Sequence, residues 1–199
     1  RQTIATNRSS TLLPDERLIG LKLSDWIVAA EDTIAVDVIV SSPQGELMEN
    51  IPVIVKLMKK EYHSVKTETP DGRFTTEHNV VTKTIESKEV ESGNNPVSVT
   101  FIPPDAGSYV IWAELKKEPD SGTAAAASVW VSGRGYVPWA DRGEDRLEMI
   151  MDKKEYAVGD QATVFIKSPF PRAELLISVG REQIFKQEIL KIEGSAYTY

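Results

Sequence analysis

Two histidines are the only imidazole side chains that could serve as a general base, and cysteine is absent. His63 lies next to Ser64, and His78 lies in a polar stretch that also contains Asp71, so a Ser-His-Asp arrangement is conceivable. However, no G-x-S-x-G sequence or similar context surrounds the serine. We therefore interpret both histidines as surface residues and expect no enzymatic activity.

One acidic cluster, Asp141, Glu144 and Asp145, resembles the calcium ligands found between some tandem adhesion modules. Ca²⁺ requires about six to eight oxygen ligands from several loops, and the sequence offers no second cluster of this type. The glycines of 133–135 precede Pro138 without opening a helix, which argues against a phosphate-binding loop. We expect no catalytic residue, no metal site and no cofactor.

The composition narrows the class of protein. The 199 residues have a formal net charge of −7, whereas nucleic-acid binding requires basic patches. No stretch approaches the roughly 18 consecutive apolar residues of a membrane helix. The lack of cysteine fits a bacterial envelope protein better than a secreted animal protein, which usually contains disulfides.

Several short stretches alternate apolar and polar side chains, as strands with one buried face do. In the first of them, Ile34, Val36, Val38 and Val40 share one face. Residues 61–79 are polar and irregular, and we interpret Ala124–Ala127 as the approach to a strand because it is too short to nucleate a helix. About seven strands result and predict an immunoglobulin-like sandwich. In the first part of the chain the alternating stretches are 32–42, 51–60, 79–87, 97–102, 108–117 and 128–131. After the Gly- and charge-rich segment 133–145, further strands are expected at LEMIM (147–151), ATVFIKS (162–168), AELLISV (173–179) and QIFKQEIL (183–190).

Two aromatic residues are candidates for structural roles. Tyr109 closes the D-x-G-x-Y sequence 105–109 just before a strand, which is typical of a tyrosine corner, whose hydroxyl bonds the upstream backbone. The alternative is an ordinary Asp-Gly turn followed by a half-buried tyrosine. Trp139 lies in a Gly- and charge-rich segment, where we expect it to act as a plug that fixes an inter-domain angle rather than to contact a ligand. Trp112 and Trp130 are expected to pack on or between sheets.

An internal repeat divides the chain into two domains. Residues 28–43 align with 156–169, which places Asp32 opposite Asp160 at an offset of 128 residues (160 − 32). The second copy has only 54 residues from Arg146 onward (199 − 146 + 1), fewer than the roughly 100 of a complete sandwich, so we expect it to be incomplete, with an exposed strand edge. The predicted fold is all-β, with tandem immunoglobulin-like antiparallel β-sandwiches. The expected parts are a linker or tail (1–15), a β-sandwich (16–134), a linker (135–145) and a partial second β domain (146–199).

The second half of the chain resembles bacterial alpha-2-macroglobulins. The similarity is carried by the sequences YVPW (136–139), LEMIMDKKEYAVGD (147–160), VFIKSPF (164–170) and ELLISVGREQI (174–184). Where the family commonly has Glu-Arg, this chain has Gly180-Arg181, so only the arginine carries over. The first domain resembles a macroglobulin domain through Gly20-Leu21, Pro43-Gln44-Gly45 and Gly107-x-Tyr109. The matched motif residues are Asp152, Lys153, Tyr156, Gly159 and Asp160, followed by Ser168, Pro169 and Phe170.

This resemblance implies a scaffold segment of a broad-range protease inhibitor that traps proteases after cleavage of a bait region. The thioester of many family members requires C-x-E-Q, which a chain without cysteine cannot provide. The implied partners are proteases and neighbouring domains of the same chain, and the implied location is the periplasm or the bacterial cell surface. The alternative function is a spacer or binding module of an adhesin or a carbohydrate-active protein. The residues expected to be structural are Tyr109, Trp139, Asp152, Tyr156, Gly159, Asp160 and Pro169.

Overall fold

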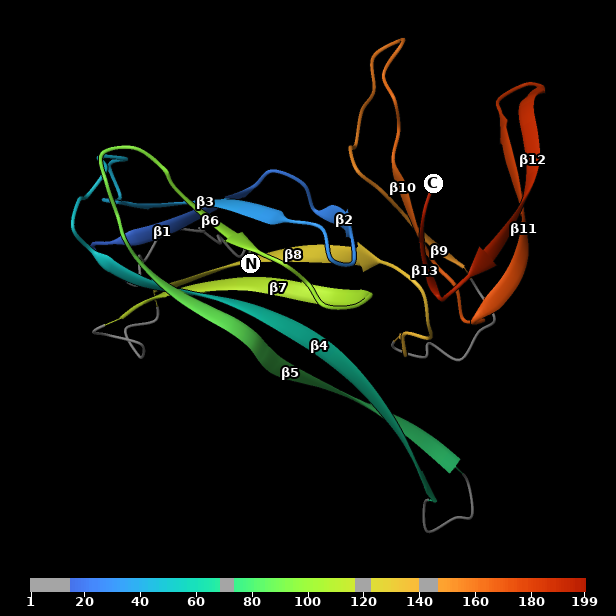
Figure 1. The fold of residues 1–199 in the computed structure, drawn as a ribbon, viewed down its shortest axis with the longest axis horizontal. Helices are drawn as coiled ribbons and strands as arrows, with labels where there is room; N and C mark the ends of the chain where they lie inside the picture. Colours follow the sequence, from blue (N-terminus) through green and yellow to red (C-terminus); the bar gives the residue numbers. More distant parts are fainter. Residues whose placement is uncertain (1–14, 69–73, 117–122, 140–146) are drawn as a thin grey trace, which may run out of the picture.

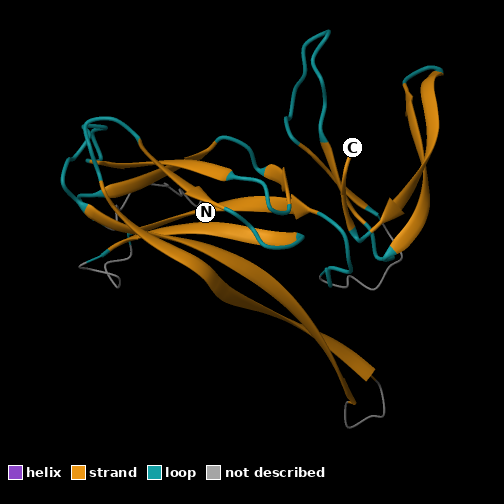
Figure 2. Cartoon of the chain, in the orientation of Figure 1, coloured by secondary structure: helices purple, strands orange, loops and turns teal. Residues whose placement is uncertain are grey.

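The computed structural model describes residues 15–68, 74–116, 123–139 and 147–199, with the backbone alone at 64–68 and 74–78. Every regular element in these residues is a strand (Figure 2). The described residues contain no helix that could span a membrane. The strands are β1 (Leu18–Leu23), β2 (Ile27–Ala29), β3 (Ile34–Ser41), β4 (Pro52–Glu68), β5 (Phe74–Glu91), β6 (Val97–Phe101), β7 (Gly107–Leu115), β8 (Ala124–Ser132), β9 (Glu148–Met151), β10 (Val164–Lys167), β11 (Arg172–Gly180), β12 (Ile184–Glu193) and β13 (Ala196–Thr198).

Strands β1–β8, here called module one, form a sandwich of two sheets (Figure 1). The first sheet has the order β1-β3-β6 and the second the order β2-β8-β7-β4-β5. The alternation seen in the sequence is the alternation of burial, because Ile34, Val36, Val38 and Val40 are at most 1% exposed. The second sheet contributes the other half of the core. Its fully buried members include Val53, Val55, Leu57, Tyr109, Ile111, Val129 and Val131.

The interpretation of residues 61–79 as irregular is wrong for their described part. Strand β4 continues to Glu68 and β5 begins at Phe74. The far ends of these two strands form a long ribbon that projects beyond the sandwich of module one (Figure 1). Strand β7 pairs with β4 only as far as Lys60, and beyond that point β4 pairs with β5 alone. A ribbon without a core beneath it has no need of an alternating apolar face, so the sequence carried no strand signal there. The expected turn at Pro70-Asp71-Gly72 lies outside the described residues.

Two further details of the strands differ from expectation. The tract Ala124–Ala127 belongs to strand β8 itself and pairs with β7, rather than leading up to the strand. The short strand β2 pairs with β8 in parallel orientation, from Ile27↔Trp130 to Ala29↔Ser132, whereas all other described pairs are antiparallel. A three-residue strand is too short to produce a periodic signal.

Strands β9–β13, here called module two, form a three-stranded sheet of order β13-β10-β9 and a separate ribbon, β11-β12 (Figure 1). The expected strands at LEMIM, ATVFIKS, AELLISV and QIFKQEIL are present, and β13 was missed. Ile166, Leu175 and Ile192 form a small buried cluster between sheet and ribbon.

The internal repeat extends to individual backbone hydrogen bonds. The bond Ser24 N–H to Ala35 O (3.0 Å) recurs as Asp152 N–H to Thr163 O (2.9 Å), shifted by 128 residues at both ends. The bond from the Asp32 amide to the Ala29 carbonyl recurs in the same way from Asp160 to Ala157. The pairing also repeats, since Leu23↔Val36 in β1-β3 becomes Met151↔Val164 in β9-β10. Strands β9 and β10 are therefore the counterparts of β1 and β3.

One position of the repeat combines the same backbone with different residues. Glu31 has a φ of 71°, and its counterpart Gly159 has a φ of 97°. A left-handed conformation is unfavourable for a residue with a Cβ and nearly free for glycine. The chain thus uses the suitable residue in module two and a strained one in module one.

Replacing Glu31 with glycine is therefore expected to stabilise module one by about 0.5–1 kcal/mol, the relief of strain exceeding the entropy gained by the unfolded chain. The bond from the residue-31 amide to the carbonyl of Pro103 (2.9 Å) remains possible in the variant. Urea unfolding measures the change. Glu46→Gly, at an exposed glutamate outside the positive-φ region, is the control and should not stabilise the protein.

Candidate functional site at the junction of the modules

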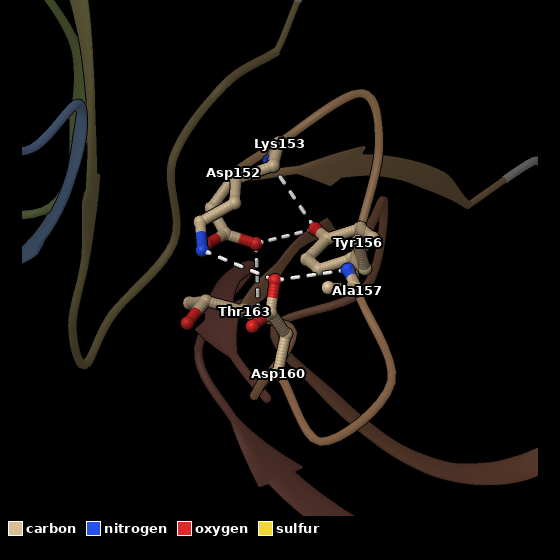
Figure 3. Close-up of polar contacts among 6 residues, drawn as sticks. All are labelled: Asp152, Lys153, Tyr156, Ala157, Asp160 and Thr163. Atoms are coloured by element: carbon tan, nitrogen blue, oxygen red, sulfur yellow. Dashed lines mark hydrogen bonds and ion pairs between the residues drawn. The ribbon is translucent and has the colours of Figure 1, made fainter.

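The motif D-K-x-x-Y-x-x-G-D forms a closed loop between β9 and β10 (Figure 3). The Tyr156 hydroxyl donates a hydrogen bond to Oδ1 of Asp152 (2.5 Å), which also accepts the amide of Thr163 (2.8 Å). The Lys153 amide donates to the Tyr156 hydroxyl (3.2 Å), so the tyrosine oxygen both donates and accepts. We call Asp152, Tyr156 and Thr163 the Asp-Tyr clasp. It ties the two ends of the loop together.

The second half of the motif closes the turn that contains Gly159. The Asp160 side chain accepts the amide of Ala157 (3.1 Å), as Figure 3 shows, and lies 3.8 Å from the ammonium of Lys153. A Cβ on Gly159 would meet no atom within 4 Å, so its positive φ, and not lack of space, favours glycine there. The loop thus brings together the motif residues that the sequence singled out.

The clasp also sets the protonation of its members. The hydrogen bond from Tyr156, followed by that from the Thr163 amide, holds the pKa of Asp152 below its ordinary value of 3.8. Burial, reinforced by the neighbouring Asp152 carboxylate, raises the pKa of Tyr156. The clasp is therefore a charged acceptor with a neutral donor across the neutral pH range.

Removing the Tyr156 hydroxyl is expected to weaken the acid dependence of stability. The lowered folded-state pKa of Asp152 contributes stability above the unfolded-state pKa, and this contribution disappears as the pH falls through the folded-state value. Tyr156→Phe removes the largest cause of the shift, so the variant should lose less stability than the wild type between about pH 4 and pH 2. Urea midpoints measured from pH 7 to 2 test this, and parallel profiles for the two proteins would contradict it.

An aromatic cluster joins the two modules. Trp130 of β8, Trp139 and Phe165 of β10 lie with ring centroids 5.7–6.1 Å apart. The Lys167 ammonium lies 3.6 Å from the centre of the Trp130 ring and pairs with Glu148 at 3.0 Å. Such edge and cation contacts stabilise beyond simple burial. The structure thus places Trp139 at the interface, where the sequence led us to expect a plug.

Ser195 is a second centre of the junction, and no sequence pattern indicated it. This fully buried residue donates its amide to the carbonyl of Gly135 (3.0 Å), and its carbonyl accepts the indole N–H of Trp139 (2.8 Å). Its hydroxyl exchanges hydrogen bonds with the backbone of Val137. The Gly133 amide adds a bond to Ala196 O (3.1 Å). The described part of the segment between the modules is therefore fastened to module two.

The clasp is connected to module one through Trp26. Its indole N–H donates to the backbone carbonyl of Asp152 (2.9 Å), and its own carbonyl accepts the amide of Trp130 (2.7 Å). Because Trp130 belongs to the aromatic cluster, a short chain of contacts links the motif loop to the junction. The clasp and the cluster form one structural site.

A similar Asp-Tyr pair lies in module one. The hydroxyl of the fully buried Tyr109 donates to the carbonyl of Asp105 (3.0 Å) and to its carboxylate, and Lys59 bonds the same carboxylate at 2.7 Å. Burial raises the pKa of Tyr109, as does its bond to Asp105. Burial of Asp105 raises its own pKa, but the bonds from Lys59 and Tyr109 outweigh this and lower it. Tyrosine and aspartate are four residues apart in both pairs.

The remaining sequence candidates do not join this site. Pro169 lies in the β10–β11 turn, where the Ser168 hydroxyl donates to Phe170 O (2.9 Å). The exposed His63 lies 3.8 Å from Glu61 in an open pocket that Asp105 also lines, but the Asp105 carboxylate is already bonded to Lys59 and Tyr109. The other candidates, Asp71, Asp141, Glu144 and Asp145 and the side chains of Ser64 and His78, lie outside what the structure describes.

No metal-binding cluster occurs within the described ranges. They hold no group of three or more His, Cys, Asp or Glu side chains that could bind a metal ion. The described residues of the junction contribute packed side chains, hydrogen bonds and the Lys167–Glu148 ion pair. The arrangement can hold two bodies at a defined angle.

Known proteins resemble this chain in sequence and in fold. No family model matches the sequence. Over 194 residues, 98% of this chain, the sequence is 37% identical to an alpha-2-macroglobulin homolog of Nostoc sp., of whose length it spans 10%. The fold is similar to part of the crystal structure of Salmonella alpha-2-macroglobulin reacted with methylamine (TM-score 0.50, 14% identity, 94% of this chain and 12% of that chain). It is also similar to part of the native conformation of E. coli alpha-2-macroglobulin (TM-score 0.54, 15% identity, 94% and 13%).

Proposed function

Because this chain belongs to the bacterial alpha-2-macroglobulin family as one segment of it, we propose that it is a scaffold segment of a broad-range protease inhibitor. The observation that carries the proposal is the 37% identity over 98% of the chain. In the proposed mechanism, cleavage of a bait region elsewhere in the protein triggers a collapse that traps the protease. This segment contributes no chemistry to that step.

The junction supports a mechanical role. A scaffold that moves during trapping must transmit the motion as rigid units. The aromatic cluster and the Ser195 bonds join the modules over residues 133–139, so we propose that modules one and two move together as one body. The turning points then lie at other boundaries of the protein. The implied partners are proteases and neighbouring domains, and the implied location is the periplasm or the bacterial cell surface.

The proposal is tested with the full-length protein. We expect incubation with several unrelated proteases to change its mobility on native gels, because one collapse follows cleavage by any of them. The same proteases with a covalently blocked active site should leave the mobility unchanged. An unchanged mobility with every active protease, or an equal shift with the blocked enzymes, would reject the inhibitor function.

A further inference from the structure

Strand β4 has an open edge beyond the point where β7 begins. Strand β7 starts at Gly107 and pairs with β4 only between Val53 and Lys60. From there β4 continues to Glu68, and among the described strands only β5 pairs with this part, on the other side (Figure 1). The free edge of residues 61–68 offers a row of unpaired backbone donors and acceptors. Its length is that of an ordinary strand, so one further strand can add to it.

The pocket that contains His63 and Asp105 lies at the start of this edge and has a volume of about 320 Å³. No described residue of β5 lines it, so an occupant of the pocket meets the edge of β4 on its open side. Tyr62, Tyr136 and Pro138 give the pocket apolar surface. The lining residues come from 59–63 of β4, from 105–106 before β7 and from 134–138 after β8.

The charge left over in this pocket is positive. Asp105 is already bonded to Lys59 at 2.7 Å. Lys60 and Arg134, by contrast, form no ion pair with any carboxylate that the structure describes. These two cations lie in the pocket with one further carboxylate, Glu61, in a chain whose formal net charge is −7. The pocket is a basic spot on an acidic protein, and its complement is an anionic ligand.

We infer that residues 61–68 and this pocket, together called the β4 edge site, bind an extended acidic peptide segment of a partner protein. The segment adds to the open edge as a strand, in line with β7, and its backbone supplies the hydrogen bonds. Its carboxylates meet Lys60 and Arg134, and an apolar side chain packs on Tyr62 and Tyr136. The inference goes beyond the proposed function and does not rest on it, because strand addition at this edge requires neither cleavage nor collapse.

Fluorescence anisotropy of labelled model peptides tests the charge preference. The probe alternates valine and glutamate over about ten residues, enough to span the edge. The reference peptide has lysine in place of every glutamate. We expect the acidic peptide to bind at least about 10-fold more tightly than the lysine peptide. Equal affinities, or no binding of the acidic peptide, would overturn the inference.

A second pair of acidic peptides tests strand addition. Each carries N-methyl groups on alternate backbone amides, one along the first edge of the extended peptide and the other along the second edge. Only one of the two should bind, because an added strand uses a single edge for its hydrogen bonds. Equal affinities of the two methylated peptides would show that β4 does not pair with the ligand, and would overturn the inference.

Charge-reversing variants locate the site on the protein. Lys60→Glu and Arg134→Glu should each weaken binding of the acidic peptide at least about 10-fold. Lys22→Glu, at an exposed lysine of β1, is the matched control and should leave binding unchanged. Urea midpoints show that each variant is folded. Equal effects of Lys22→Glu and Arg134→Glu would refute the β4 edge site.

Hydrogen exchange separates a peptide ligand from a second copy of this chain. With the acidic peptide bound, we expect slower exchange of those amides of 61–68 that point away from β5, and unchanged exchange in β11. Unchanged exchange of 61–68 would overturn the inference. Protection of 61–68 without peptide that grows with protein concentration, together with a dimer in sedimentation, would assign the edge to a second copy and overturn it too.

Discussion

Trp139→Ala is expected to widen the angle between the two modules while leaving module one folded. The substitution removes the ring contacts with Trp130 and Phe165 and the hydrogen bond to Ser195. Replacing a buried tryptophan with alanine costs about 3–5 kcal/mol, and the value here should lie near the lower end because Trp139 is only partly buried. This cost falls on the interface, because the core of module one does not include Trp139.

Small-angle scattering measures the change in angle, and urea unfolding measures the stability of module one. We expect a larger radius of gyration for Trp139→Ala and an intermediate value for Trp139→Phe, which keeps a ring and loses the indole N–H. Trp112→Ala is the matched control, since Trp112 lies on β7 with its indole bonded to Glu114, away from the junction. Scattering curves that superimpose for wild type and Trp139→Ala would show that the tryptophan does not fix the angle.

The sequence predicted the strands that have one buried face. Ile34, Val36, Val38 and Val40 alternate because they fill a core, and the same cause makes them visible in the sequence. The β4–β5 ribbon beyond Lys60 covers no core, and β2 and β13 have three residues each, so none of these had a periodic signal to detect.

The junction was predictable only in part. Trp139 was identified because a large aromatic in a polar segment needs a place to pack. Its partners are Trp130 of β8, Phe165 of β10 and Ser195 of the β12–β13 turn, and only the fold brings them together. One signal was nevertheless present in the repeat. Phe165 stands where module one has Asp37, and this change on the outer face of the strand marks where module two meets module one.

The repeat distinguishes the features that both modules share from those that only module two has. The family resemblance pointed to the motif residues 152–160. Their hydrogen bonds close the loop between β9 and β10. The corresponding loop of module one has neither the tyrosine nor the glycine of the motif. The backbone bonds are shared between the two loops, whereas the Asp-Tyr clasp is not. The clasp is therefore an addition to a common strand connection, at the place where module two contacts Trp26.

Tyr109→Phe is expected to destabilise module one by about 1–2 kcal/mol. Phenylalanine fills the same fully buried space, so the cost comes from the lost hydroxyl rather than from a cavity. The Asp105 carbonyl and carboxylate lose their shared donor. Because the Asp105 side chain is 56% exposed, water can replace part of that bond, which keeps the cost below that of a deeply buried charge.

The pH dependence distinguishes this loss from a packing defect. The pKa of Asp105 is lowered in the folded state, so its contribution is present above the ordinary value of 3.8 and disappears as the pH falls through the lower folded-state value. The difference between Tyr109→Phe and wild type should therefore shrink below about pH 4. Tyr136→Phe, at an exposed tyrosine, should show no difference at any pH. A deficit of Tyr109→Phe that stayed constant from pH 7 to 2 would show that the lost bond to the carboxylate does not cause the effect, because packing and the bond to the Asp105 carbonyl do not change with pH.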